Sequence, residues 1–161
     1  MGAQFSQVFP PKLTLTERDV ESRQGRVFLI MGGYSGLGFR LAKILYRKKG
    51  RVYIAGRSEE KARQAIAEIL SVEPKGGALD FLHLDLEDLR TISSTAEAFK
   101  AKETRLDVLW NNAGVSQPPV GNVSKQGIEL QLAVNCLGPF LLTQLLLPLL
   151  ERRLEVLLCQ N

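Results

Sequence analysis

The 161-residue sequence predicts an α/β protein built on a doubly wound parallel sheet. Three observations support this fold class. Short apolar runs alternate with segments of helical periodicity, and a glycine-rich turn separates the first apolar run from the first helical segment. Hydrophobic residues make up 45% of the sequence and charged residues 24%, which excludes the disordered and collagen-like classes.

The segments follow one another in the order that such a sheet requires. Residues 1–25 are polar and are expected to form an N-terminal arm, ahead of a single domain over residues 26–161. Strands are expected at 26–31, 51–55, 79–84 and 106–110, where short apolar runs without polar alternation indicate burial on both faces. Apolar residues spaced three and four apart predict the intervening helices, within 37–45, 59–69 and 89–99.

The last third of the chain is the most apolar part. A long helix is expected from about Gln126 to Arg152, and no residue between Leu130 and Leu150 is charged. That stretch is long enough to cross a membrane, but its Gln, Asn, Gly and Pro residues favour a helix buried in a protein core. A fifth strand is expected at Leu154–Cys159. Strands and helices in this order predict a Rossmann-like fold, truncated after about the fifth strand.

Charge and cysteine content narrow the functional classes. The net charge is +4 without a dense basic stripe, so no nucleic-acid partner is expected. Two cysteines are too few for a disulfide framework and favour a reducing compartment, so we expect a cytoplasmic protein. One histidine and no Cys-x-x-Cys motif exclude a Cys/His zinc site, and no metal is expected. The N-terminus fits the myristoylation pattern, and an acyl chain on Gly2 would give weak membrane contact.

The glycine-rich turn after the first strand is the main candidate binding site. Gly32, Gly36 and Gly38 open the first helix, and Ser35 and Leu37 between them join the candidate cofactor-binding residues. Glycine lets the backbone approach a phosphate closely, and a helix N-terminus offers N–H groups and a positive dipole end. A P-loop would need Lys and Ser/Thr after the last glycine, and a nucleophile elbow would need glycine in place of Leu37. A plain glycine-rich turn is the remaining alternative.

The end of the second strand indicates which dinucleotide fits. An acidic residue there would bind the ribose 2′-hydroxyl of NAD. The sequence instead reads Ala55-Gly56-Arg57, which offers no carboxylate to repel a 2′-phosphate and a guanidinium to pair with one. NADP is therefore the expected cofactor, unless Arg57 is only a solvated charge near a helix start.

Four motifs, taken in order, resemble the short-chain dehydrogenase/reductase family. They are the glycine loop, Asp85 after the third strand, Asn111-Asn112-Ala113-Gly114 after the fourth, and Val134-Asn135 in the long helix. The resemblance runs from about residue 26 to residue 150 and implies that Asp85 contacts the adenine. It also implies that Asn112, Ala113 and Gly114 lie along the cofactor and support the sheet. The N-terminal residues look like a fungal, retinol-dehydrogenase-like subgroup, some of whose members act on secondary metabolites.

The resemblance also makes Asn135 the candidate catalytic residue, as the asparagine of the family's Asn-Ser-Tyr-Lys set. Pro139 has no N–H to bond the carbonyl of Asn135, which would leave that carbonyl free to hold a water. The alternative is a buried asparagine that caps a kink. No Tyr-x-x-x-Lys motif occurs in the 161 residues. The family's serine, tyrosine and lysine would follow Asn161, so we expect a truncated chain.

The activity implied by the resemblance is NADP-dependent interconversion of an alcohol and a carbonyl on a small substrate. Without the tyrosine–lysine pair the chain has no evident general acid, so whether it is an enzyme stays open. The alternative is an inactive NADP-binding module, or an unstable fragment, that pairs with a full-length relative. The long helix 126–152 carries apolar residues on every face and is the expected dimerisation surface.

Overall fold

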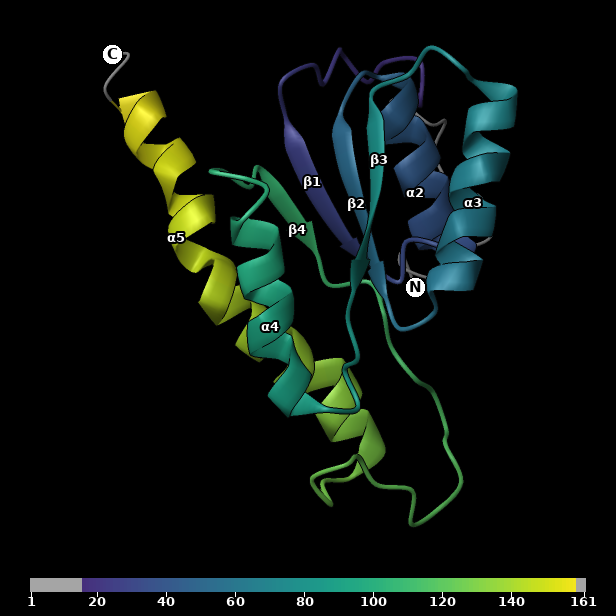
Figure 1. Ribbon diagram of the computed structural model, residues 1–161, viewed down its shortest axis with the longest axis vertical. Helices are drawn as coiled ribbons and strands as arrows, with labels where there is room; N and C mark the ends of the chain where they lie inside the picture. The colour runs from purple at the N-terminus through teal and green to yellow at the C-terminus, as the bar shows by residue number, and fades with distance from the viewer. Residues whose placement is uncertain (1–15, 159–161) are drawn as a thin grey trace, which may run out of the picture.

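The computed structural model describes residues 16–158 (Figure 1). Its strands form one sheet in the order β3-β2-β1-β4. All three strand pairs are parallel, so each connection must cross over through a helix or a long loop. The predicted Rossmann-like α/β fold is therefore confirmed. The strands are β1 (Val27–Met31), β2 (Arg51–Gly56), β3 (Ala78–His83) and β4 (Val108–Trp110).

Helices cover both faces of the sheet, which is the doubly wound arrangement. On one face lie α2 (Gly36–Arg47) and α3 (Glu59–Val72), and on the other lie α4 (Leu89–Lys100) and α5 (Gly138–Leu158) (Figure 1). A short π-helix, η1 (Leu132–Leu137), leads directly into α5. Because all three strand pairs are parallel, the chain enters every strand from the same end of the sheet.

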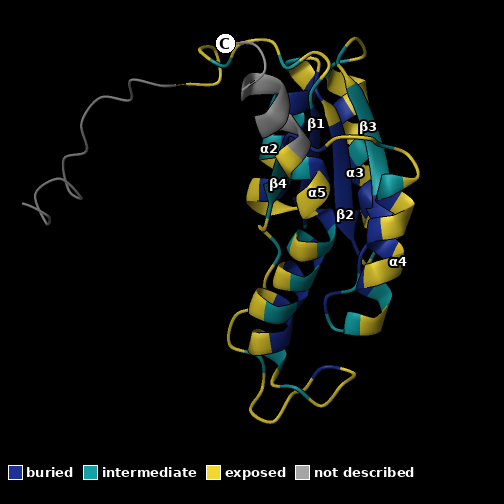
Figure 2. Cartoon of the chain, turned by 90° about the vertical axis from the view of Figure 1, so that its left-hand side faces the viewer, coloured by how far each residue is buried: buried dark blue, intermediate teal, exposed yellow. Residues whose placement is uncertain are grey.

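The central strand β1 divides its side chains between two cores. Leu29 and Met31 pack with the core under α4 and α5, whereas Phe28 and Ile30 pack with the core under α2 and α3. All five residues of β1 are buried, and so is β2 after its first residue, Arg51 (Figure 2). Burial on both faces explains why the sequence of this strand has no polar alternation.

The predicted start of the helix at residue 59, which is α3, is confirmed by its N-terminal cap. Ser58 precedes α3, and its hydroxyl accepts a hydrogen bond from the amide of Lys61 at 3.3 Å. Glu59 and Glu60 occupy the first turn, where their negative charge stabilises the positive end of the helix dipole. The apolar face of α3 buries Ala62, Ala65 and Ile69 against the sheet.

The prediction that the long helix begins at Gln126 is wrong. Gly127 has a φ of +74°, which lies outside the helical region. Glu129 marks the actual helix start, because its carboxylate accepts hydrogen bonds from the amides of Gln131 and Leu132 at 2.9 and 2.8 Å. These two bonds also lower the pKa of Glu129.

The first turns of the long helix are π-helical, although the sequence predicts one continuous α-helix. The amide of Gly138 donates to the carbonyl of Ala133, five residues earlier. Pro139 follows directly and has no N–H to complete the α pattern. The wider turn therefore lies next to the proline, and Asn135 falls within it.

The predicted fifth strand at Leu154–Cys159 is also wrong over residues 154–158, because α5 continues through Leu158. Leucine and glutamate favour helix, and Val156 is the single β-branched residue in the segment. Cys159 lies outside the described residues. So do residues 1–15 of the expected arm, including Gly2.

The segment Leu132–Glu151 is long and apolar enough to cross a membrane, by length and composition alone. In the structure Leu142 and Leu146 of α5 are fully buried in the core that α4 and β1 share. This packing supports the prediction of a core helix.

Candidate functional site

A cavity of about 150 Å³ opens at the carboxyl ends of the strands. Five of the predicted site residues line it, and they come from the loops after β1, β2, β3 and β4. In open parallel sheets ligands bind at this edge, where the strand order changes direction, here between β1 and β4. The five residues are Gly32, Arg57, Asp85, Ala113 and Gly114.

The glycine loop leaves open space in front of α2. Gly32 and Gly36 have φ values of +71° and +54°, in the left-handed region that side chains rarely adopt. A Cβ added to Gly36 would meet no atom within 4 Å. Ser35 is the N-cap of α2 but its side chain makes no capping bond, and the first turn holds no acidic residue. Leu37 follows with 82% of its surface exposed.

Gly38 differs from Gly36 because it lies in tight contact. A Cβ there would lie 2.5 Å from the carbonyl oxygen of Gly32 and 2.7 Å from Nδ2 of Asn112. The same Nδ2 donates to the carbonyl of Met31 at 3.0 Å, which ties the loop after β4 to the end of β1. Gly38 therefore allows α2 to pack against this junction, which Asn112 holds together.

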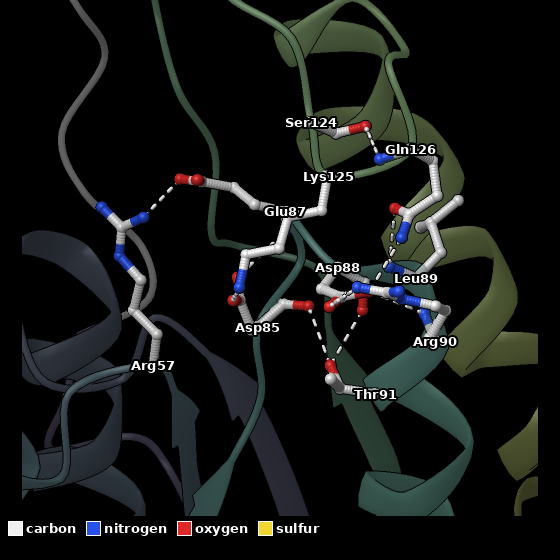
Figure 3. Close-up of polar contacts among 10 residues, drawn as sticks. All are labelled: Arg57, Asp85, Glu87, Asp88, Leu89, Arg90, Thr91, Ser124, Lys125 and Gln126. Atoms are coloured by element: carbon white, nitrogen blue, oxygen red, sulfur yellow. Dashed lines mark hydrogen bonds and ion pairs between the residues drawn. The ribbon is translucent and has the colours of Figure 1, made fainter.

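Charged side chains from the loops after β2 and β3 and from the segment before the long helix lie together (Figure 3). The Arg57 guanidinium is ion-paired with the Glu87 carboxylate, and both residues line the cavity. The Asp85 carboxylate accepts a hydrogen bond from the amide of Glu87 at 3.0 Å. It also faces Nζ of Lys125 at 3.8 Å. Two positive and two negative side chains thus meet where the loops after β2 and β3 come together.

Asp88 fastens the loop after β3 to the segment before the long helix. Its carboxylate accepts hydrogen bonds from the Arg90 guanidinium at 2.9 and 2.8 Å and from Nε2 of Gln126 at 2.8 Å. These donors, Arg90 above all, hold the pKa of Asp88 well below its usual range. Oε1 of Gln126 accepts in turn from the amide of Leu89 at 3.1 Å, so the two segments cap α4 together.

Asn135 joins the π-helical turn to the loop after β4. Its Oδ1 accepts from the amide of Val115 and its Nδ2 donates to the carbonyl of Val115, both at 2.8 Å. A Cβ on Gly114 would lie 3.1 Å from that Oδ1. Asn135 therefore positions the cavity wall formed by Gly114, Val115 and Val134. The water predicted on its main-chain carbonyl stays a prediction.

Glu87 and Tyr34 also line the cavity, although the sequence pattern indicated no role for either. The sequence shows no carboxylate at the end of the second strand, but the structure brings the Glu87 carboxylate from the loop after β3 to Arg57. The register of β2 and β3 sets Gly56 opposite His83, which brings the residues after both strands together. The sequence signal that could have indicated Glu87 is an acidic residue shortly after Asp85. Tyr34 packs on Gly56 so closely that a Cβ there would lie 2.2 Å from its ring.

The parallel sheet and the glycine loop at its carboxyl edge define a Rossmann-like domain. Residues 26–155 match the family model described as short chain dehydrogenase. The chain belongs to the short-chain dehydrogenase/reductase family, whose members are oxidoreductases that bind a nicotinamide cofactor.

Similar proteins of this family occur in fungi and bacteria. The chain is 50% identical over 152 residues to the short-chain dehydrogenase/reductase iacJ of Pestalotiopsis fici, covering 91% of this chain and 47% of that protein. It is 48% identical to pkfC of Emericella nidulans, covering 88% and 45%. The solved complex of Pseudomonas aeruginosa RhlG with NADP aligns with a TM-score of 0.68 at 32% identity, covering 81% and 48%. The chain spans a little under half the length of the two fungal relatives.

Proposed function

We propose that this chain holds NADP(H) in the cavity at the carboxyl edge of its sheet. We propose further that the whole protein interconverts an alcohol and a carbonyl on a small apolar substrate. The observation that carries the cofactor proposal is Arg57, which stands in the cavity at the end of β2. The NADP complex of the related Pseudomonas protein supports the same cofactor.

The residues of the site fit a dinucleotide phosphate. The open space at Gly36 and the uncapped N-terminus of α2 suit a pyrophosphate, because the amides there lack side-chain partners and the helix dipole favours an anion. Arg57 would hold the 2′-phosphate through its guanidinium, which suits bidentate pairing. Asp85 would contact the adenine, and Asn112, Ala113 and Gly114 would lie along the cofactor. When bound, the nicotinamide ring supplies or accepts a hydride.

Proton transfer is not a role that the tyrosines of this chain suit. None of Tyr34, Tyr46 and Tyr53 is followed by lysine four residues later. Burial and the hydrogen bond to Glu103 raise the pKa of Tyr53 to about 12, which makes it a weak acid at neutral pH. We therefore propose that these 161 residues bind the nucleotide, and that Asn135 positions the cavity wall rather than moving a proton.

Titration with NADP⁺ and NAD⁺, followed by fluorescence, tests the cofactor proposal. A charge-assisted bond to a phosphate contributes about 1.5–3 kcal/mol, and the Arg57 side chain is exposed, so we expect NADP⁺ to bind about tenfold tighter than NAD⁺. Arg57→Asp should reverse the preference. Arg63→Asp makes the same charge change on the exposed side of α3, where Arg63 pairs with Glu59, and should leave it unchanged. NAD⁺ binding as tightly as NADP⁺ to the unmodified chain would refute the proposal.

We also propose a cytoplasmic location and pairing with a second copy through the long helix. Three large apolar side chains of this helix are exposed: Leu132 at 48%, Phe140 at 63% and Leu147 at 36%. Covering them would remove apolar surface from water. Light scattering during size-exclusion chromatography should report a dimer, and a monomer at high concentration would argue against pairing.

A further inference from the structure

The cavity assigned above to NADP(H) already contains an anion at its cationic end. The Glu87 carboxylate is ion-paired with Arg57, the residue proposed to hold the 2′-phosphate (Figure 3). We propose that Glu87 is a specificity-determining residue: it occupies the Arg57 guanidinium until a 2′-phosphate displaces it. This inference rests on the proposed function, because it concerns the same nucleotide.

Competition follows from the chemistry of the two anions. A carboxylate and a phosphate use the same N–H donors of a guanidinium, and both prefer its planar fork. Arg57 and Glu87 both line the cavity, so the displaced carboxylate would face the incoming phosphate. NAD has no 2′-phosphate and leaves the pair intact. Glu87 therefore weakens the binding of NADP and leaves that of NAD unchanged.

The backbone of Glu87 is fixed, so displacement requires only a side-chain rotation. The amide of Glu87 donates to Oδ1 of Asp85 at 3.0 Å, and its carbonyl accepts from the amide of Lys125 at 3.0 Å. The side chain itself is 32% exposed and has solvent into which to turn. Rotamer changes at such positions take picoseconds to nanoseconds, so the pair does not block the site kinetically.

Asp85, the second carboxylate of the cavity, does not depend on Arg57. Its Oδ2 faces Nζ of Lys125 at 3.8 Å, and its Oδ1 accepts the Glu87 amide. The competition is therefore confined to one pair. The Arg57 side chain is 63% exposed, and surface pairs of this kind contribute modestly. Removal of the Arg57–Glu87 pair therefore corresponds to a gain in NADP affinity of about three- to fivefold.

The test uses the full chain and three nucleotides: NADP⁺, NAD⁺ and adenosine 2′,5′-bisphosphate, which carries the 2′-phosphate without nicotinamide. Glu87→Gln keeps the side-chain length and removes the charge, and Glu87→Ala serves as a second variant. Glu97→Gln is the matched control, because it removes an equal charge from an exposed pair with Lys100 on α4. Dissociation constants are measured by calorimetry at constant salt.

We expect both Glu87 variants to bind NADP⁺ and the bisphosphate about three- to fivefold tighter, with NAD⁺ and the Glu97→Gln control unchanged. In an Arg57→Gln background the gain should fall below about twofold, because no guanidinium remains to be released. An unchanged NADP⁺ affinity, an equal gain for NAD⁺, or a gain undiminished without Arg57 overturns the inference. Failure of the unmodified chain to bind any of the three nucleotides would instead refute the proposed function.

Discussion

Replacing Gly38 by alanine tests how the glycine loop is built. The new Cβ would lie 2.5 Å from the carbonyl oxygen of Gly32 and 2.7 Å from Nδ2 of Asn112. The carbonyl of Gly32 cannot shift freely, because the amide of the same residue donates to the carbonyl of Ala55 at 2.7 Å. The helix must therefore move away from β1, or Asn112 must release the carbonyl of Met31.

The size of the effect follows from three contributions. Overpacking a well-packed site costs about 1–3 kcal/mol. Loss of the hydrogen bond from Asn112 to Met31 costs about 1 kcal/mol more. Alanine recovers about 1 kcal/mol because Gly38 lies within α2, where glycine is a poor helix former. We expect a net loss of about 1–3 kcal/mol in the free energy of unfolding.

Thermal and urea unfolding measure this loss. At about 2–4 °C per kcal/mol for a chain of this size, the melting temperature should fall by roughly 2–12 °C. Gly25→Ala is the control: Gly25 has a φ of +73° but nothing within 4 Å of its Cβ position. Its free energy of unfolding should fall by only about 1–2 kcal/mol, which is the cost of alanine in the left-handed region. Its nucleotide affinity should stay unchanged. A Gly38→Ala chain with unchanged stability would refute the packing argument.

Three further predictions concern the surrounding hydrogen bonds. Asn135→Ala removes both bonds to Val115 and should lower the unfolding free energy by about 1–3 kcal/mol in urea; no loss would contradict its positioning role. Asp88 has a lowered pKa in the folded chain, so its stabilisation is present above its unfolded pKa and is lost as pH falls. Asp88→Asn should flatten the acid side of the stability–pH profile, and a profile as steep as before would count against this. The pKa of Tyr53 is raised to about 12, so the stability that its neutral form contributes is lost as pH rises from about 10. Tyr53→Phe should abolish this loss of stability at alkaline pH. An unchanged loss would implicate other groups.

Local patterns predicted the fold well. The apolar run at 26–31 could be read as a central strand because burial on both faces leaves no polar alternation, and β1 is buried throughout. Asp85 could be predicted because the residue that follows a buried strand has a local signature. Gly32, Arg57, Asp85, Ala113 and Gly114 converge because parallel strands end at one edge, which the alternation of strands and helices already implies.

Features that depend on contacts between residues far apart in the sequence could not be predicted. The partner of Arg57 is set by the register of β2 against β3, and sequence spacing alone does not give that register. The start of the long helix depends on a positive φ at Gly127 and on the cap that Glu129 provides. The segment 154–158 is apolar enough for either a strand or a helix, and short apolar runs of this kind are ambiguous by periodicity.

The central claim is that the carboxyl edge of the sheet binds NADP(H). Two-dimensional ¹H–¹⁵N spectra of the 161-residue chain, recorded while NADP⁺ is added, test it most directly. We predict that the largest amide shifts fall on residues 32–38, on Arg57, on Asp85 to Glu87, and on residues 112–115, with Glu97 and the rest of α4 nearly unmoved. Shifts confined to the exposed side of α5, or no shifts at millimolar NADP⁺, would contradict the claim.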